Sequence, residues 1–159
     1  QSPREILEAM NYRMLARSHG GFTTCLVLRV TANGQATAAN AGHLAPYLQG
    51  REVAIENGLP LGLSADTRYS ETTFRLPENA QLTLISDGVV EARDAKGALL
   101  GFERTAALAT ESAAKIADEA QQFGQSDDIT VLTVTRVTAG RETLARMPAS
   151  ELSMAGGTA

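Results

Sequence analysis

Apolar residues recur along this chain with two different periods, one typical of helices and the other typical of strands. Near the N-terminus they recur every three or four residues, directly after Ser2, Pro3 and Glu5, which have the form of a helix-capping box. This pattern predicts an amphipathic helix that begins at Pro3 and ends near residue 20. The apolar side chains of its stripe are Ile6, Leu7, Met10, Met14 and Leu15.

The period then shortens to that of β-strands. Residues 22–30 and 35–40 predict two strands, and Asn33 and Gly34 between them supply the positive φ that a tight hairpin needs. Residues 44–48 and 52–56 could form a second hairpin. Residues 69–76 and 81–86 predict a further strand pair, joined across residues 77–80.

The C-terminal half adds helix and one more strand. An alanine-rich segment predicts helix over residues 101–123, interrupted at residues 110–112 and stopped by Gly124. Residues 129–137 predict the last strand. Hairpins with flanking helices give a layered α+β fold. We interpret residues 139–159, rich in Ala, Gly, Ser, Arg and Glu, as a mostly unstructured tail in which residues 142–147 could form a short helix.

The composition of the chain limits the classes of function that it can have. A chain of 159 residues with 43% hydrophobic residues has the size and the apolar content of one domain. A net charge of −4 without any basic run argues against nucleic acid or an anionic membrane as the main partner. No apolar stretch approaches the roughly 20 residues of a membrane span. The single cysteine, Cys25, excludes an internal disulfide and fits a reducing cytoplasm, and its apolar neighbours favour a small buried side chain over a nucleophile.

Two short acidic segments are the most informative part of the chain. Asp87 follows the apolar run 81–86, and Asp127 precedes the apolar run 129–137. If these two strands pair antiparallel, both carboxylates lie at the same edge of the sheet. Carboxylate oxygens suit Mg²⁺ and Mn²⁺, and Gly88 directly after Asp87 lets the backbone turn without a Cβ clash. The alternatives are an ordinary Asp-Gly turn at Asp87 and a strand start at Asp127 whose carboxylate caps loop amides.

Four segments in order resemble the metal-dependent Ser/Thr protein phosphatases of the PPM class, and within it the bacterial SpoIIE branch. They are Asn40-Ala41-Gly42-His43, residues 58–63, Ser86-Asp87-Gly88-Val89-Val90-Glu91-Ala92, and residues 124–130. The resemblance covers residues 2–137. It implies part of an α-β-β-α sandwich with largely antiparallel sheets.

The resemblance also implies roles for individual residues. Asp87 and Asp127 take metal-ligand positions, and Gly88, Asp128 and Thr130 support them, Asp128 by hydrogen bonding where related phosphatases carry Asn. His43 is a candidate general acid, although a hydrogen-bonded turn histidine is an equal alternative. One further segment consists of Gly58, Leu59, Pro60, Leu61 and Gly62. It forms either a rigid turn or a docking site for the substrate or a partner.

One departure from the family pattern affects activity. Such phosphatases carry a further Asp-Gly or Asp-x-x-Gly segment near the start of the domain, and its aspartate bridges two metal ions. Nothing similar precedes Asn40, where the acidic residues are Glu5 and Glu8, and the chain opens with Gln1. We therefore expect residues 1–138 to be part of a phosphatase domain, residues 139–159 a tail, and this chain to bind Mn²⁺ or Mg²⁺ weakly and to be catalytically incomplete.

Two functions from different classes follow. The first is metal-dependent hydrolysis of phosphoserine or phosphothreonine on a regulatory protein, such as an antagonist of an anti-sigma factor. The alternative is a non-catalytic interaction module that uses the phosphatase fold in partner switching. A hydrolase of small phosphoesters would explain the carboxylates but not the order of the motifs. We expect a cytoplasmic protein, as part of a longer sensor chain, without direct membrane contact, and a homo-oligomer formed through the truncated sheet edges.

Overall fold

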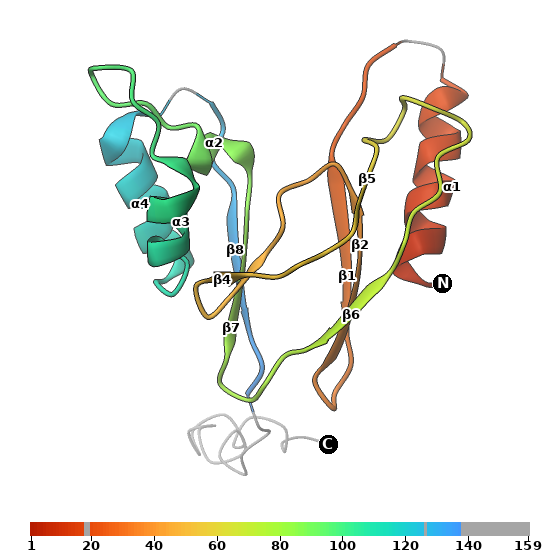
Figure 1. Ribbon diagram of the computed structural model, residues 1–159, viewed down its shortest axis with the longest axis horizontal. Coiled ribbons are helices and arrows are strands. Elements are labelled where there is room, and N and C mark those ends of the chain that lie inside the picture. Colours follow the sequence, from red (N-terminus) through yellow and green to blue (C-terminus); the bar gives the residue numbers. More distant parts are fainter. Residues whose placement is uncertain (18–19, 126, 138–159) are drawn as a thin grey trace, which may run out of the picture.

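Two β-sheets lie face to face between layers of helix in the computed structural model, which describes residues 1–17, 20–125 and 127–137 (Figure 1). The predicted α+β sandwich with largely antiparallel sheets is therefore confirmed. The predicted tail, residues 139–159, lies outside the described residues. In the part of the chain that is described, no helix has the length and apolar character to cross a membrane.

The first sheet is built around β2 (Gln35–Ala41), which pairs antiparallel with β1 (Cys25–Val30) and β6 (Thr72–Arg75) and parallel with β5 (Asn57–Gly58). Helix α1 (Pro3–Leu15) covers its outer face, and the predicted capping box is present, because the Ser2 side chain accepts a hydrogen bond from Glu5 N. Six of the seven β2 residues are buried, and four of them are alanines. Small side chains let the helix and the opposite sheet approach this central strand closely.

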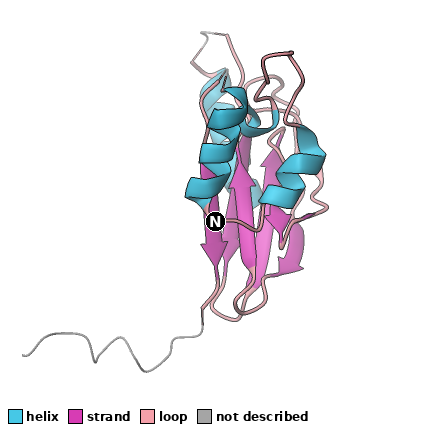
Figure 2. Ribbon diagram, turned by 90° about the vertical axis from the view of Figure 1, so that its left-hand side faces the viewer, coloured by secondary structure: helices cyan, strands magenta, loops and turns pink. Residues whose placement is uncertain are grey.

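The second sheet has the order β4 (Arg51–Glu52), β3 (Tyr47–Leu48), β7 (Gln81–Ile85) and β8 (Val131–Thr135). Three helices cover it: α2 (Asp87–Val90), α3 (Gly101–Leu108) and α4 (Ala113–Gly124). Figure 2 shows these helices lying over the strands. The break between α3 and α4 falls where the sequence predicts it, and the Ser112 side chain caps α4 by accepting from Lys115 N.

One predicted strand pair is wrong. Residues 69–76 and 81–86 were expected to pair with each other, but β6 pairs with β2 in the first sheet and β7 pairs with β3 and β8 in the second. The turn after Leu76 therefore carries the chain from one sheet to the other. Strand periodicity identifies a strand but not its partner, and short spacing in sequence favoured a hairpin. The predicted second hairpin exists, but β3 and β4 have two residues each.

Cys25 begins β1 and packs, half-buried, against the cluster of apolar side chains between α1 and the first sheet. Burial raises the pKa of its thiol. A thiol with a raised pKa forms little thiolate at neutral pH, which fits a small hydrophobic side chain and not a nucleophile.

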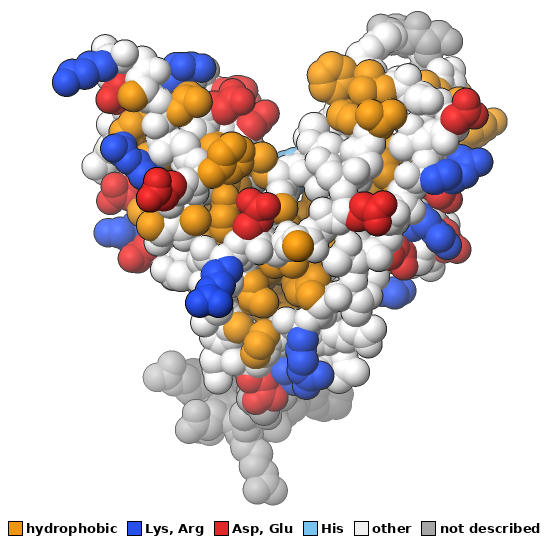
Figure 3. Space-filling view, in the orientation of Figure 1, with side chains coloured by type: hydrophobic (Ala, Val, Ile, Leu, Met, Phe, Trp, Pro, Cys, Tyr) orange, Lys and Arg blue, Asp and Glu red, His pale blue; other side chains and the backbone are white. Residues whose placement is uncertain are grey.

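The two sheets meet at one end of the sandwich and diverge at the other (Figure 3). At the end that we call the closed end, Leu76 N donates to Gly34 O and Asn79 N donates to Arg136 O, each at 2.8 Å. Arg136 also donates to Ala32 O and forms a 3.1 Å ion pair with Glu78. The core between the sheets is centred here, on Leu76, Ala80 and Leu82. The opposite end, which we call the open end, carries the acidic segments.

Candidate functional site

Asp87 and Asp127 lie at the same edge of the second sheet, at the open end. Antiparallel pairing of β7 with β8 sets Ile85 opposite Val131, so the residues just beyond these two positions are neighbours. Asp87 is the first residue of α2, and Asp127 lies in the loop between α4 and β8. Both side chains are exposed. The structure thus brings together the two carboxylates that the sequence singles out.

Ser86 fastens the two acidic segments to each other. Its backbone N donates to Thr130 O at 2.9 Å, its Oγ accepts from Thr130 N at 2.8 Å, and its Oγ donates to Asp128 O at 3.2 Å. Thr130 and Asp128 therefore support the site through their backbones. Sequence reasoning assigned no role to Ser86, although a hydroxyl between a strand and an aspartate was a visible signal.

Gly88 permits the close approach of the two segments. A Cβ at this position would collide with the Asp128 carbonyl and would lie 3.4 Å from Asp127 O. The constraint is the neighbouring backbone and not the φ angle, since Gly88 is helical. Each carboxylate also accepts from the next amide, Asp87 Oδ1 from Gly88 N at 3.1 Å and Asp127 Oδ1 from Asp128 N at 2.7 Å. These bonds orient both side chains before any ligand binds.

The donor set fits a divalent metal ion in part. Asp87 and Asp127 offer hard oxygen donors, which Mg²⁺ and Mn²⁺ prefer. Among the described residues, however, no group of three or more His, Cys, Asp or Glu side chains is arranged to hold a metal ion. The two aspartates are therefore suited to be two ligands of a larger set and do not form a complete site by themselves.

His43 stands beside Asp87, on the segment that crosses from β2 in the first sheet to β3 in the second. Its Nδ1 lies 3.1 Å from Thr24 Oγ1. Burial lowers the pKa of His43, and the Asp87 charge and a hydrogen bond with the Ile85 backbone oppose that shift without cancelling it. The imidazole is therefore mainly neutral at pH 7. Thr24 was not identified from the sequence, because only the fold brings it to His43.

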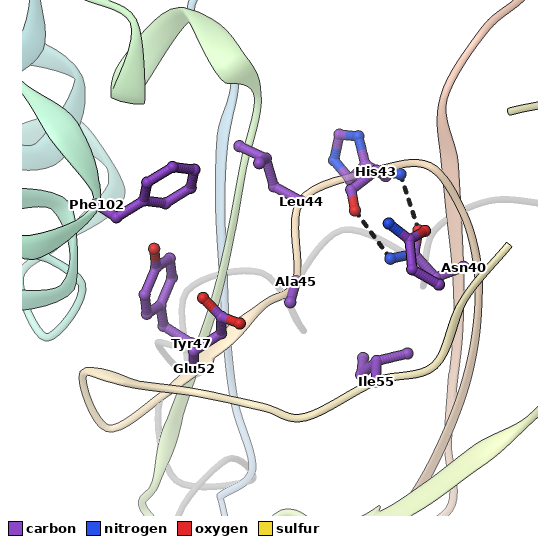
Figure 4. A pocket seen from close by; sticks show the side chains of 9 residues that line it. Asn40, His43, Leu44, Ala45, Tyr47, Glu52, Ile55 and Phe102 are labelled. Atoms are coloured by element: carbon purple, nitrogen blue, oxygen red, sulfur yellow. Dashed lines mark hydrogen bonds between the residues drawn. The ribbon is translucent and has the colours of Figure 1, made fainter. Parts of the chain in front are cut away.

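A pocket of about 380 Å³ opens between the two sheets below His43 (Figure 4). Its walls are partly apolar, from Leu44, Ile55 and Phe102, and partly polar, from Asn40 and Glu52. The side chain of Phe102 on α3 is 58% exposed. His43 lines this pocket and also experiences the charge of Asp87, so the pocket lies on the side of His43 toward the interior of the cleft, with neither Asp87 nor Asp127 in its wall.

The predicted docking segment is divided by the fold. Leu61 is fully buried in the core under α1, so its side chain is not available to a partner, and Gly62 N donates to Asn11 Oδ1 at 2.8 Å. Pro60 packs against Gly42, next to His43. Leu59 is 53% exposed, and Gly58 pairs with β2. Leu59 is thus the member of this segment with an exposed side chain.

Solved structures of several bacterial proteins share this fold. The SiaA-PP2C domain of Pseudomonas aeruginosa matches with a TM-score of 0.70 and 19% identity, over 85% of this chain and 60% of that one. The RsbU and RsbW domains of Rv1364c from Mycobacterium tuberculosis match with a TM-score of 0.61 and 22% identity, over 86% and 42%. The phosphatase domain of SpoIIE from Bacillus subtilis matches with a TM-score of 0.59 and 11% identity, over 88% and 76%. The chain therefore spans about two fifths to three quarters of these relatives.

The sandwich is that of PP2C- and SpoIIE-type phosphatase domains. The family model for Stage II sporulation protein E (SpoIIE) matches residues 1–137, and the chain belongs to this family. No curated protein is significantly similar to it in sequence. The family membership predicted from the four ordered motifs is confirmed.

Proposed function

We propose that this chain is the part of a metal-dependent Ser/Thr protein phosphatase domain that supplies Asp87 and Asp127 to the metal site. The observation that carries the proposal is the convergence of two acidic segments, fastened by Ser86, at one edge of a SpoIIE-type sandwich. A structural neighbour, the SpoIIE phosphatase domain, was solved from Mn-presoaked crystals, which supports Mn²⁺ as the ion to test.

The residues present would act as follows. Asp87 and Asp127 bind the cation, while Ser86 and Gly88 hold their loops at the required separation. The chemistry that a bound Mn²⁺ or Mg²⁺ supplies is activation of water at neutral pH and neutralisation of phosphate charge. His43, whose pKa burial lowers and whose Nδ1 lies 3.1 Å from Thr24 Oγ1, stays the candidate for proton transfer. Since two carboxylates hold Mg²⁺ weakly, the remaining ligands come from residues of the complete domain.

As substrate we propose phosphoserine or phosphothreonine on a cytoplasmic regulatory protein such as an anti-sigma factor antagonist. The neighbour that contains RsbU and RsbW domains supports a partner-switching context. Leu59 and Phe102, exposed on opposite sides of the open end, offer apolar contacts to a folded protein substrate. A small phosphoester would not contact these two side chains.

The test is Mn²⁺ binding and turnover, in this chain and in a chain extended N-terminally to the full length of the phosphatase relatives. Asp87→Asn and Asp127→Asn should each weaken Mn²⁺ binding in both chains and abolish turnover of a phosphoprotein by the extended chain. Asp118→Asn on α4 removes the same charge from an exposed site and should change neither. Turnover that survives both substitutions would overturn the proposal, and an inert extended chain would leave the interaction module as the function.

We also propose that this chain self-associates through its sheet edges. In the described residues β1 and β8 end their sheets, and each has one edge without a paired strand. Leu132 of β8 is 54% exposed although it shares a sheet face with the buried Leu82. An apolar face at an open edge favours pairing with another strand. Size-exclusion chromatography with light scattering should show a dimer or larger, and a monomer at high concentration would refute this.

A further inference from the structure

The backbone around His43 is held in place by hydrogen bonds and by close packing, all from residues in or next to the first sheet. Asn40, 2% exposed, accepts from His43 N at 2.9 Å and donates from Nδ2 to His43 O at 2.8 Å, as Figure 4 shows. Gly42 has φ +73°, and any Cβ there would collide with Pro60. Gly42 N also donates to Asn57 Oδ1. The position from which the imidazole projects is therefore set by the first sheet.

The imidazole itself reaches from one sheet to the other. On the first-sheet side, Thr24, next to the start of β1, places Oγ1 3.1 Å from Nδ1. On the second-sheet side, the ring lies near the backbone of Ile85, the last residue of β7, and experiences the charge of Asp87 two positions later. The side-chain hydrogen bonds of Ser86, which follows this strand end, lead to the β8 side of the same sheet.

We propose that Thr24 and His43 form a positioning pair for the Asp87 carboxylate: the Thr24 hydroxyl orients the imidazole, and the imidazole holds the end of β7 from which Asp87 follows. The pair ties the acidic edge to the first sheet at the open end. The β-branched side chain of Thr24 has few rotamers, which favours a fixed hydroxyl direction. This assignment rests on the proposed function only in the claim that Asp87 binds metal.

The alternative role for His43 is proton transfer, and Thr24 separates the two. A positioning hydroxyl affects the site through the geometry of the imidazole, so it should matter for metal affinity as well as for turnover. Hydrogen-bond partners behind metal ligands typically contribute about 10- to 100-fold to metal affinity. A residue that acts only in proton transfer would leave Mn²⁺ affinity unchanged and lower kcat.

The experiment compares Thr24→Val with Thr24→Ser. Valine keeps the shape without the hydroxyl, and serine keeps the hydroxyl. Thr23→Val is the matched control, because Thr23 is the neighbouring exposed threonine and its Oγ1 contacts only backbone at 3.4 Å. We expect Thr24→Val to weaken Mn²⁺ binding about tenfold, Thr24→Ser to stay within about twofold of the wild type, and Thr23→Val to have no effect.

A double-mutant cycle with His43→Ala tests whether the two residues act together. In the His43→Ala background, Thr24→Val should cause no further loss of Mn²⁺ affinity. A further loss there, or unchanged affinity in Thr24→Val alone, would overturn the proposal. If Asp87→Asn leaves Mn²⁺ binding unchanged, the proposed metal site fails and the pair is judged by NMR. In that case the amide signals of residues 85–88 and the ring signals of His43 should shift in Thr24→Val and not in Thr24→Ser, and identical spectra would refute it.

Discussion

The closed and open ends of the sandwich differ in how deeply the inner face of the same two strands, β7 and β8, is buried. Along the inner face of the β7–β8 pair, Leu82 at the closed end is fully buried, whereas Leu132 near the open end is 54% exposed. Arg136, just after β8, joins the two sheets at the closed end through its hydrogen bond to Ala32 O. At the open end the His43 ring contacts Thr24 beside the first sheet and experiences the charge of Asp87 on the second. The difference shows that the apolar packing between the two sheets is concentrated away from the carboxylates, which leaves the acidic edge accessible.

The largest expected effect is a difference between two leucines of one sheet face. Leu82→Ala should lower the free energy of unfolding by about 2–5 kcal/mol, because it leaves a cavity in the closed-end core. Leu132→Ala should cost less than about 1 kcal/mol, since water already reaches this side chain. Urea unfolding followed by circular dichroism measures both. Equal costs would mean that the open end is covered in solution, and the comparison would fail.

The next largest effect is expected from a substitution that pushes the two acidic segments, those of Asp87 and Asp127, apart. Gly88→Ala should push the Asp128 carbonyl away, lower the free energy of unfolding by about 1–3 kcal/mol and weaken Mn²⁺ binding at least about tenfold. Gly97→Ala is the control. It costs about 1–2 kcal/mol through its positive φ, with nothing within 4 Å of the added Cβ, and should leave Mn²⁺ binding unchanged. Calorimetric titration with Mn²⁺ distinguishes the variants, and equal Mn²⁺ affinities would contradict the close approach.

A smaller effect is expected from the closed-end arginine. Arg136→Met removes the ion pair with Glu78 and the bond to Ala32 O, and it should cost about 0.5–1.5 kcal/mol. Lys115→Met removes the exposed 3.9 Å pair with Glu119 and should cost no more than about 0.5 kcal/mol. Thermal unfolding at low and high salt compares them. Arg136→Met should not alter Mn²⁺ binding, and a loss of affinity would show that the two ends are coupled.

The smallest effect is the pH response of the open end. Because burial lowers the pKa of His43, its NMR titration midpoint should fall below the usual 6.5, and Asp87→Asn should lower it further by removing a favourable charge. The folded chain then binds this proton less readily than the unfolded chain. His43 therefore contributes stability above pH 6.5 that is lost as the pH falls from 6.5 toward the folded midpoint. A midpoint at or above 6.5 would contradict the burial of the ring.

Much of the fold follows from local pattern. The capping box at Ser2 and Glu5, the break between α3 and α4, and the β1–β2 hairpin depend on neighbouring residues, and the structure confirms them. The exchange of partners between β6 and β7 was missed, because strand pairing depends on the energy of the whole sandwich and not on the residues between the strands.

For the site, the sequence by itself determined which carboxylates meet, since Asp87 and Asp127 flank two strands whose antiparallel pairing places them at one edge. Only the tertiary structure decided that Leu61 is core, that Ser86 fastens the acidic segments, and that Thr24 reaches His43. The physical reason is distance along the chain. Local propensities act over a few residues, whereas these contacts join segments that only packing brings together.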